Sequence, residues 1–304
     1  VAVFGDYDVD GITAACLLTD YLRSRGLTCE LYIPDRIREG YGLNAAAIDA
    51  LAAKGVTLIV TVDCGVTNLE ETAYAAQRGV DMIVTDHHEC REALPEAEAV
   101  VDPKQPDSSG VGTALAGVGV AFKLVCAMDG DADKMLARYG DLVAVGTVAD
   151  VMPLLGENRF ITRCGLQKIA AGDCRPGFLA LAEEAGVRDK PFTASTVGFS
   201  LAPRINAAGR LGEPSLAVRL LEETDLRRAR VLAAELCAKN RERQALEMEI
   251  WREAVERLHG EQPDAPIDLV IPTTDLELTN VIFERLFGSL EKAQEERSPK
   301  KRVS

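Results

Sequence analysis

Acidic and imidazole side chains recur in this sequence where short apolar runs end. Four segments carry them: Asp6, Asp8 and Asp10 in G-D-Y-D-V-D-G, Asp63 in T-V-D-C-G, Asp86, His87 and His88 in V-T-D-H-H-E, and Asp150 in V-A-D-V. Carboxylates that lie within a few ångströms of one another raise each other's pKa, and bound divalent cations relieve their repulsion. If the fold gathers these four segments, they predict a metal centre.

The ligand types indicate which metals and which chemistry to expect. Carboxylate and imidazole groups suit Mn²⁺, Mg²⁺ or Fe²⁺ better than metals that prefer sulfur. This many ligands could hold two ions about 3.5–4 Å apart, bridged by one carboxylate and a water. Two such ions would lower the pKa of that water. The pattern therefore points to metal-assisted hydrolysis.

Each signal also has an ordinary explanation when it is taken alone. G-D-Y-D-V-D-G matches the first half of an EF-hand loop, although its twelfth position is Leu17 instead of Glu and a strand precedes it. A single aspartate after a strand is commonly a helix cap or turn residue. Gly117 and Gly119 in G-V-G-V-A-F could let a phosphate approach, or could equally serve tight helix packing. The acidic segments gain weight because they share strand ends.

The segments before these residues have the pattern of a parallel sheet. Apolar runs alternate with stretches of helical spacing over about residues 1–112. The expected strands are 1–4, 30–33, 57–62, 81–85 and 99–101, and the expected helices between them are 12–25, 44–54 and 68–79. Such alternation predicts an α/β fold with a doubly wound, mostly parallel sheet. Ligands bind such sheets outside the carboxyl ends of the strands, and Asp63, which follows the expected middle strand, is the candidate bridge.

From about residue 113 the sequence becomes mainly helical. The expected helices are 115–128, 134–148, 160–171, 178–185, 193–201 and 215–222. The run 225–260 lacks proline and has glycine only at its last position, so it predicts one long helix that connects two lobes. We therefore expect a sheet region at about 1–112, a helical subregion at about 113–224, a connector helix at 225–260 and a short C-terminal segment at 261–304.

The order of the acidic motifs resembles that of the DHH phosphoesterase family, and within it the branch of single-strand-specific exonucleases. The similarity rests on all four acidic segments and on two further ones, L-A-G-V-G-V-A-F-K-L at 115–124 and L-A-P-R-I-N-A-A-G-R-L-G at 201–212. It covers roughly residues 1–258. The resemblance implies a metal-dependent phosphodiesterase that digests single-stranded DNA from 5′ to 3′, releases 5′-mononucleotides and serves DNA repair and recombination.

The resemblance also implies roles for particular residues. It predicts two Mn²⁺ or Mg²⁺ ions, with Asp63, His87 and His88 as catalytic residues. The implied ligands are Asp8, Asp10, Asp63, His87 and Asp150, with Asp6 as a further member of the metal site. The implied substrate contacts are Arg204, Asn206, Arg210 and His88, and the histidine could donate to the scissile phosphate. Arginine forks bind phosphate in pairs of hydrogen bonds, although these arginines could instead pair with the chain's many acids.

Two features of the sequence depart from this expectation. Members of the family normally carry a second, DHHA1-like domain after the connector helix, and we expect it to be missing or truncated here. The net charge of −14 argues against a general nucleic-acid binder. Two alternatives therefore stay open: a phosphodiesterase of the same family that acts on short oligonucleotides or cyclic dinucleotides, and a DNA-binding scaffold without catalysis.

The cysteine pattern and the hydropathy of the sequence indicate which cellular location to expect. The eight cysteines are scattered and form no C-x-x-C pair, which is typical of reduced thiols and predicts a cytoplasmic protein. No run approaches the roughly 18 apolar residues that a membrane span needs, so we expect no membrane partner. Single-stranded DNA is the expected partner, and by resemblance a single-strand-binding protein and a helicase could be others.

Overall fold

The computed structural model describes residues 1–261 except 37, 41, 107 and 109–111. The chain divides into two compact units, Val1–Arg243 and Gln244–Ser304. The first unit contains the sheet and every candidate site residue. The expectations of a short C-terminal segment at 261–304 and of a missing or truncated second domain fall on residues beyond 261, which lie outside the described part of the chain.

A five-stranded parallel sheet forms the centre of the first unit. Its strands are β1 (Ala2–Gly5), β2 (Glu30–Tyr32), β3 (Leu58–Val62), β4 (Asp81–Thr85) and β5 (Ala99–Val101), in the order β2-β1-β3-β4-β5. Every neighbouring pair is parallel. The central strand is β3, as the sequence predicts. All of these strands therefore end at the same edge of the sheet.

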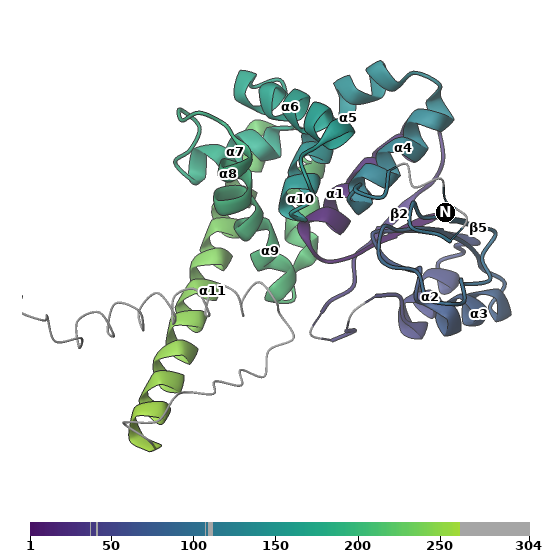
Figure 1. The fold of residues 1–304 in the computed structure, drawn as a ribbon, viewed down its shortest axis with the longest axis horizontal. Coiled ribbons are helices and arrows are strands. Elements are labelled where there is room, and N and C mark those ends of the chain that lie inside the picture. Colours follow the sequence, from purple (N-terminus) through teal and green to yellow (C-terminus); the bar gives the residue numbers. More distant parts are fainter. Residues whose placement is uncertain (37, 41, 107, 109–111, 262–304) are drawn as a thin grey trace, which may run out of the picture. The chain divides into compact units, whose positions relative to one another are not determined.

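Helices cover both faces of the sheet, which confirms the doubly wound α/β fold (Figure 1). On one face the helices are α1 (Val9–Ser24), α4 (Gly117–Asp129) and α5 (Ala132–Ala149), and their apolar residues share a core with Val3, Val60 and Val62. On the other face, α2 (Ala45–Ala53) and α3 (Leu69–Gln77) pack on Phe4 and Ile59. Alternate residues of a strand point to opposite faces, so β1 supplies Val3 to one core and Phe4 to the other, and β3 supplies Val60 and Ile59 in the same way.

The helical part continues from α5, and its last helix extends past Arg243, where the first unit ends. Its elements are α6 (Gly156–Ala171), α7 (Pro176–Glu184), α8 (Ala194–Thr196), η1 (Val197–Leu201), α9 (Ala202–Arg210), α10 (Pro214–Glu222) and α11 (Leu226–Glu261). Helices α5 and α6 cross closely because Gly165 leaves room for the carbonyl of Gly140. No described helix combines the length and the apolar character that a membrane crossing requires.

One helix differs from its sequence-based expectation. The segment expected as an α-helix over 193–201 is a single turn followed by the π-helix η1, and α9 then continues to Arg210. Pro203 lacks the N–H that an α-helix would give to the carbonyl of Phe199, so the regular hydrogen-bond pattern cannot run through this point. The wider π-turn carries the chain past the proline.

Candidate metal centre

Strand register places the candidate residues in one row. Gly5 of β1 is level with Val62 of β3, and Val62 is level with Thr85 of β4. The next residue of each strand is an aspartate: Asp6, Asp63 and Asp86. The loop after β1 adds Asp8 and Asp10, and α5 adds Asp150, which ends that helix. The fold thus gathers all four acidic segments at the carboxyl edge of the sheet.

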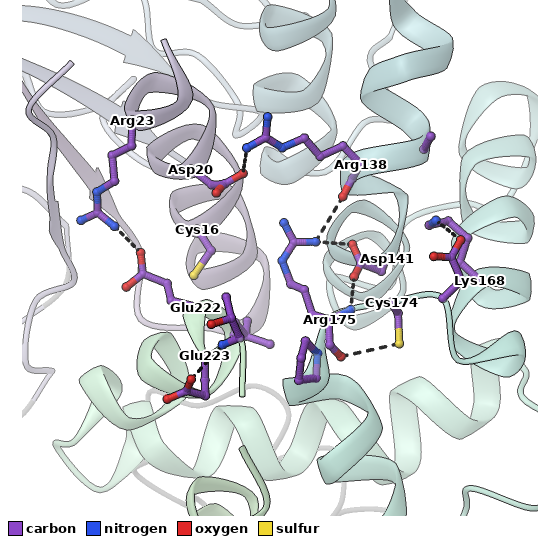
Figure 2. A pocket seen from close by; sticks show the side chains of 15 residues that line it. Cys16, Asp20, Arg23, Arg138, Asp141, Lys168, Cys174, Arg175, Glu222 and Glu223 are labelled. Atoms are coloured by element: carbon purple, nitrogen blue, oxygen red, sulfur yellow. Dashed lines mark hydrogen bonds and ion pairs between the residues drawn. The ribbon is translucent and has the colours of Figure 1, made fainter. Parts of the chain in front are cut away.

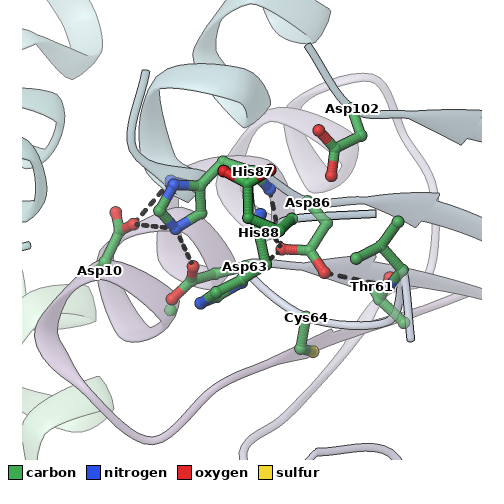
Figure 3. A network of polar contacts seen from close by, with 12 residues as sticks. Asp10, Thr61, Asp63, Cys64, Asp86, His87, His88 and Asp102 are labelled. Carbon is green, nitrogen blue, oxygen red and sulfur yellow. Dashed lines mark hydrogen bonds and ion pairs between the residues drawn. The ribbon is translucent and has the colours of Figure 1, made fainter. Parts of the chain in front are cut away.

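His87 stands at the middle of this cluster (Figure 3). Its Nε2 atom lies 3.0 Å from Asp63 Oδ1, 3.7 Å from Asp150 Oδ2 and 3.8 Å from Asp10 Oδ2. His87 Nε2 and Asp63 Oδ1 are buried and face each other, yet they form no well-aligned hydrogen bond with any described residue. Two buried polar atoms so arranged are suited to share a cation.

The ligand atoms fall into overlapping groups. Within each group the atoms lie no more than 4.8 Å apart, and the groups are Asp6-Asp8-Asp63, Asp10-His87-Asp150 and Asp63-His87-His88. Asp63 joins the first group to the third, and His87 joins the third to the second. This arrangement fits two neighbouring cation positions with Asp63 between them. The buried Asp6 Oδ1, which has no hydrogen-bond partner among the described residues, fits the same reading.

Helix α4 fixes the orientation of Asp10. The backbone N–H groups of Gly117 and Val118, at the start of α4, donate to the two carboxylate oxygens of Asp10 at 2.6 and 2.9 Å. A Cβ atom on Gly117 would lie 2.5 Å from the Cβ of Asp63, so only glycine fits there. Gly117 therefore allows close packing at the metal centre, whereas Gly119 packs on Leu115. The helix N-terminus binds a carboxylate of the chain itself.

Helix α9 holds the loop that carries the first acids. Asp8 caps α1 by accepting from Gly11 N at 2.9 Å, and Asn206 Oδ1 accepts from Val9 N at 3.1 Å. A side chain on Gly209 would collide with the carbonyl oxygen of Tyr7. Asn206 thus contacts the backbone between two candidate ligands.

The two arginines of the same segment lie differently. Arg204 Nη1 donates to the carbonyl of Ser200 at 2.5 Å, so its guanidinium is engaged with its own helical segment. Arg210, at the other end of α9, is partly exposed. The structure therefore brings Asn206 to the metal loop, and it gives Arg204 a local partner.

Burial dominates the electrostatics of the cluster. Burial and the nearby Asp8 raise the pKa of Asp6 to about 7. Burial and the surrounding carboxylates raise the pKa of Asp10 and of Asp63 well above the usual range. Burial lowers the pKa of His87 to about 4, so its ring is neutral and able to act as a ligand. Without cations the cluster therefore holds protons at neutral pH.

Asp86 positions the two histidines through hydrogen bonds to its carboxylate. Its Oδ1 accepts from the backbone of His87 at 2.8 Å and pairs with His88 Nδ1 at 2.7 Å, and its Oδ2 accepts from Val66 N at 3.0 Å. The hydrogen bond to Asp86 raises the pKa of His88 to about 9. Although burial opposes it, the hydrogen bond from His88 keeps the pKa of Asp86 below its usual value. His88, half exposed, therefore presents a cationic ring beside the cluster.

Backbone strain coincides with the cluster. Two described residues other than glycine have a positive φ, Asp63 at 59° and Val151 at 56°. Asp63 is a candidate ligand, and Val151 directly follows another, Asp150. Such conformations are costly for residues with a Cβ and gather at functional sites.

A separate pocket lies at the other end of α1. It has a volume of about 470 Å³, and charged side chains line it (Figure 2). Its cations are already paired with acids: Arg23 with Glu222, Arg138 with Asp20, Arg175 with Asp141 and Lys168 with Asp173. None of the lining residues is a candidate ligand. Within the part of the chain that the structure describes, we therefore take the acidic cluster as the candidate site.

Comparison with known proteins shows the family. Residues 1–147 match the N-terminal domain of the DHH family. A solved exonuclease RecJ bound to manganese is 37% identical, with a TM-score of 0.79 over 95% of this chain and 72% of that one. The chain belongs to the DHH family. RecJ of Thermus thermophilus, solved with Mn²⁺, matches this DHH chain with a TM-score of 0.76 at 34% identity, over 95% of this chain and 42% of that one.

Curated relatives of this DHH chain are also RecJ proteins. RecJ of Dickeya dadantii, a single-stranded-DNA-specific exonuclease, is 41% identical over 89% of this chain and 50% of its own length. RecJ of Bacillus subtilis is 40% identical over 87% of this chain and 33% of its own length. The DHH chain thus spans half or less of these curated relatives.

Sequence reasoning missed one strand-end aspartate of the DHH chain and one long-range contact of a residue that it had named. Asp102 follows β5 and is level with the other three aspartates, since Thr85 pairs with Val101. Its carboxylate accepts from Lys104 N at 2.7 Å and so closes a turn. The V-V-D-P segment carries the same strand-end signal as Asp63. The contact of Asn206 with Val9 has no signal in local sequence, because 197 residues separate the two.

Proposed function

We propose that this chain hydrolyses single-stranded DNA from 5′ to 3′ and releases 5′-mononucleotides, with two Mn²⁺ or Mg²⁺ ions, in DNA repair and recombination. The observation that carries the proposal is the junction of two ligand groups at Asp63 and His87, whose facing atoms lie 3.0 Å apart. The substrate class comes from the RecJ proteins to which the chain is similar.

The proposed ligands follow the groups of neighbouring atoms. Asp6, Asp8 and Asp63 would hold one cation, and Asp10, His87 and Asp150 the other, with Asp63 shared. When bound, the two dications supply a water of lowered pKa and offset the charge of the phosphate. The neutral ring of His87 and the fixed carboxylate of Asp10 keep the ligand geometry in place before substrate arrives.

Two residues outside the ligand set would act on the phosphate. His88, cationic through Asp86, would donate a hydrogen bond to a non-bridging oxygen of the scissile phosphate. Arg210 would bind the sugar–phosphate backbone. Arg204, which donates to Ser200 through one nitrogen, would be a further contact, and we assign Asn206 to positioning through its bond to Val9.

The domain roles and partners are further parts of the proposal. We assign catalysis to residues 1–224 and a connecting role to the helix at 225–260. Single-stranded DNA is the proposed partner. Binding to a single-strand-binding protein or a helicase, and a cytoplasmic location, stay predictions.

A nuclease assay tests the proposal directly. The chain is incubated with Mn²⁺ and four substrates: a single strand labelled at its 5′ end, the same strand labelled at its 3′ end, the matching duplex and a dinucleotide. We expect release of labelled mononucleotide first from the 5′ label, little cleavage of the duplex, and none in EDTA. A preference for the dinucleotide would replace the proposal with the short-substrate alternative. Strand binding without cleavage would favour the scaffold.

A further inference from the structure

An exposed apolar rim lies around the end of α5, where Asp150 caps the helix. The rim consists of Val151, Leu155 and Phe199, whose exposed fractions are 80%, 73% and 85%. Val151 follows the candidate ligand Asp150 directly. Phe199 belongs to η1, which packs on α5, and its neighbour Gly198 faces Val148, two residues before Asp150. The rim and the ligand thus flank the same helix end.

The segment that carries Val151 and Leu155 is held firmly in place. Val151 N donates to Val148 O at 3.1 Å and Met152 N to Thr147 O at 3.3 Å, which closes the end of α5. The buried Asn158 donates to the carbonyls of Ala114 and Pro153, at 2.5 and 3.2 Å. These bonds tie the segment to the residues before α4, whose N–H groups hold Asp10. The rim is therefore fixed relative to the candidate ligands.

Val151 adopts a strained backbone conformation, and its largely exposed side chain gains little burial in return. A helix that ends in this way usually has glycine at the left-handed position, because a side chain there is strained. Val151 is β-branched, with φ at 56°, and buries little of its side chain. The π-turn of η1 similarly turns Phe199, a large apolar side chain, towards solvent. Strain and exposure at one edge of a site indicate a contact made only with a ligand.

We propose that the apolar rim receives the unpaired bases of the strand whose phosphate lies at the metal centre, with Phe199 as the stacking residue. A nucleotide joins an anionic phosphate to an apolar base, which matches a cation site bordered by an apolar rim. Single strands bind proteins by stacking bases on aromatic rings. In a duplex the base faces are already stacked, so the rim would also distinguish single from double strands. The inference rests on the proposed function and specifies how the chain would contact the bases of its substrate.

Matched substrates isolate the contribution of the bases. The rate constant kcat/KM is measured with Mn²⁺ on a 5′-phosphorylated strand and on the same strand with abasic residues at its 5′ end. We expect Phe199→Ala to lower kcat/KM on the normal strand by about 5- to 100-fold, the factor that one lost stack gives, and to leave the abasic strand unchanged. Phe199→Trp should restore the rate. Leu27→Ala, an exposed apolar change in the turn before β2, is the control and should change neither substrate.

Val151→Gly gives a readout that a structural role would not produce. Glycine relieves the left-handed strain, so the unfolding temperature should rise or stay level, while discrimination between normal and abasic strands should fall. If Phe199→Ala and the unaltered chain have equal kcat/KM on the normal strand, the rim is not a base site. A protein partner would then be the alternative occupant of the rim. An equal loss on both strands would exclude a base site as well, because such a loss does not depend on bases.

Binding separates failure of this inference from failure of the proposed function. Affinity for a phosphorothioate-linked strand is measured by fluorescence anisotropy in the presence of Mn²⁺. If the unaltered chain cleaves neither strand, the proposed function fails, and the rim is judged on binding alone. A roughly 5- to 100-fold weaker affinity of Phe199→Ala supports the rim, and an unchanged affinity refutes it.

Discussion

His87 Nε2 lies 3.0 Å from Asp63 Oδ1, although the two residues come from the ends of different strands. The contact forms because β3 and β4 are parallel neighbours in register, with Val62 level with Thr85. Both atoms are buried, and neither has a well-aligned hydrogen bond within the described part of the chain. A cation that binds between them would satisfy both at once.

Asp63→Asn should therefore remove metal binding more completely than any other single change. The amide keeps the shape of the side chain but loses the charge that two cations would share. Changes in residues that merely support ligands typically cost roughly 10- to 100-fold in metal affinity, and we expect a larger loss here. Calorimetric titration with Mn²⁺ measures it. Asp133→Asn, in the exposed first turn of α5, is the control, and an equal effect of both changes would contradict the assignment.

Removing metal should make the stability of the chain fall as pH rises. The pKa of Asp6 is raised to about 7, that of His88 to about 9, and that of Asp63 well above its usual range. From about pH 6.5 to 8.5 the folded chain then holds more protons than the unfolded chain, so its free energy of unfolding decreases. His87, with its pKa lowered to about 4, acts oppositely only below about 6.5, its unfolded value.

Thermal unfolding in EDTA and in Mn²⁺ checks this pH dependence. The metal-free chain should melt at a lower temperature at about pH 8.5 than at about pH 6.5. Mn²⁺ should raise the melting temperature more at the higher pH, because fewer protons must be displaced from the ligands. A metal-free chain with equal melting temperatures at both values would show that the carboxylates are not held protonated.

Asp86→Asn should return His88 towards ordinary behaviour. The carboxylate of Asp86 raises the pKa of His88 to about 9, and an amide cannot do so. Proton NMR titration of the metal-free variant should place this pKa near the usual value of about 6.5. The stability that the pair contributes is fully present below about pH 6.5 and is lost as pH rises through about 9, so the variant should lose most stability at about pH 6.5 and little above about pH 9. An unchanged titration would exclude the pair as the cause.

Asn206→Ala should weaken metal binding without touching a ligand. Asn206 holds Val9 N, between Asp8 and Asp10, so its loss frees the loop that carries both carboxylates. We expect a roughly 10- to 100-fold lower affinity for Mn²⁺ by calorimetry, as for other residues that orient ligands. Asn44→Ala removes a hydrogen bond of similar length, to Ala47 N, at the start of α2. This control should lower stability by about 0.5–2 kcal/mol and leave metal affinity unchanged.

The sequence predicts the strand ends well because local patterns define them. Asp63 and His87 follow short apolar runs, and parallel strands must end at one edge, so their meeting follows from pattern and topology alone. The contact of Asn206 with Val9 and the bond of Gly117 to Asp10 could not be predicted in the same way. They depend on how helices far along the chain pack on the sheet, and no local pattern encodes that packing. The π-turn at Phe199 was wrongly expected as α-helix, although Pro203 gave a signal for the irregularity.

The engagement of Asp10 by α4 has a consequence for the proposed binding of single-stranded DNA. A helix N-terminus is a ready place for a phosphate, but Gly117 and Val118 already give their N–H groups to Asp10. The chain also carries a net charge of −14, which repels a polyanion at a distance. Attraction for the strand must then come largely from the cations that the acids collect. Divalent metal would thereby control the binding of the strand as well as its cleavage. In the presence of a chelator the chain would therefore release DNA instead of holding it uncut.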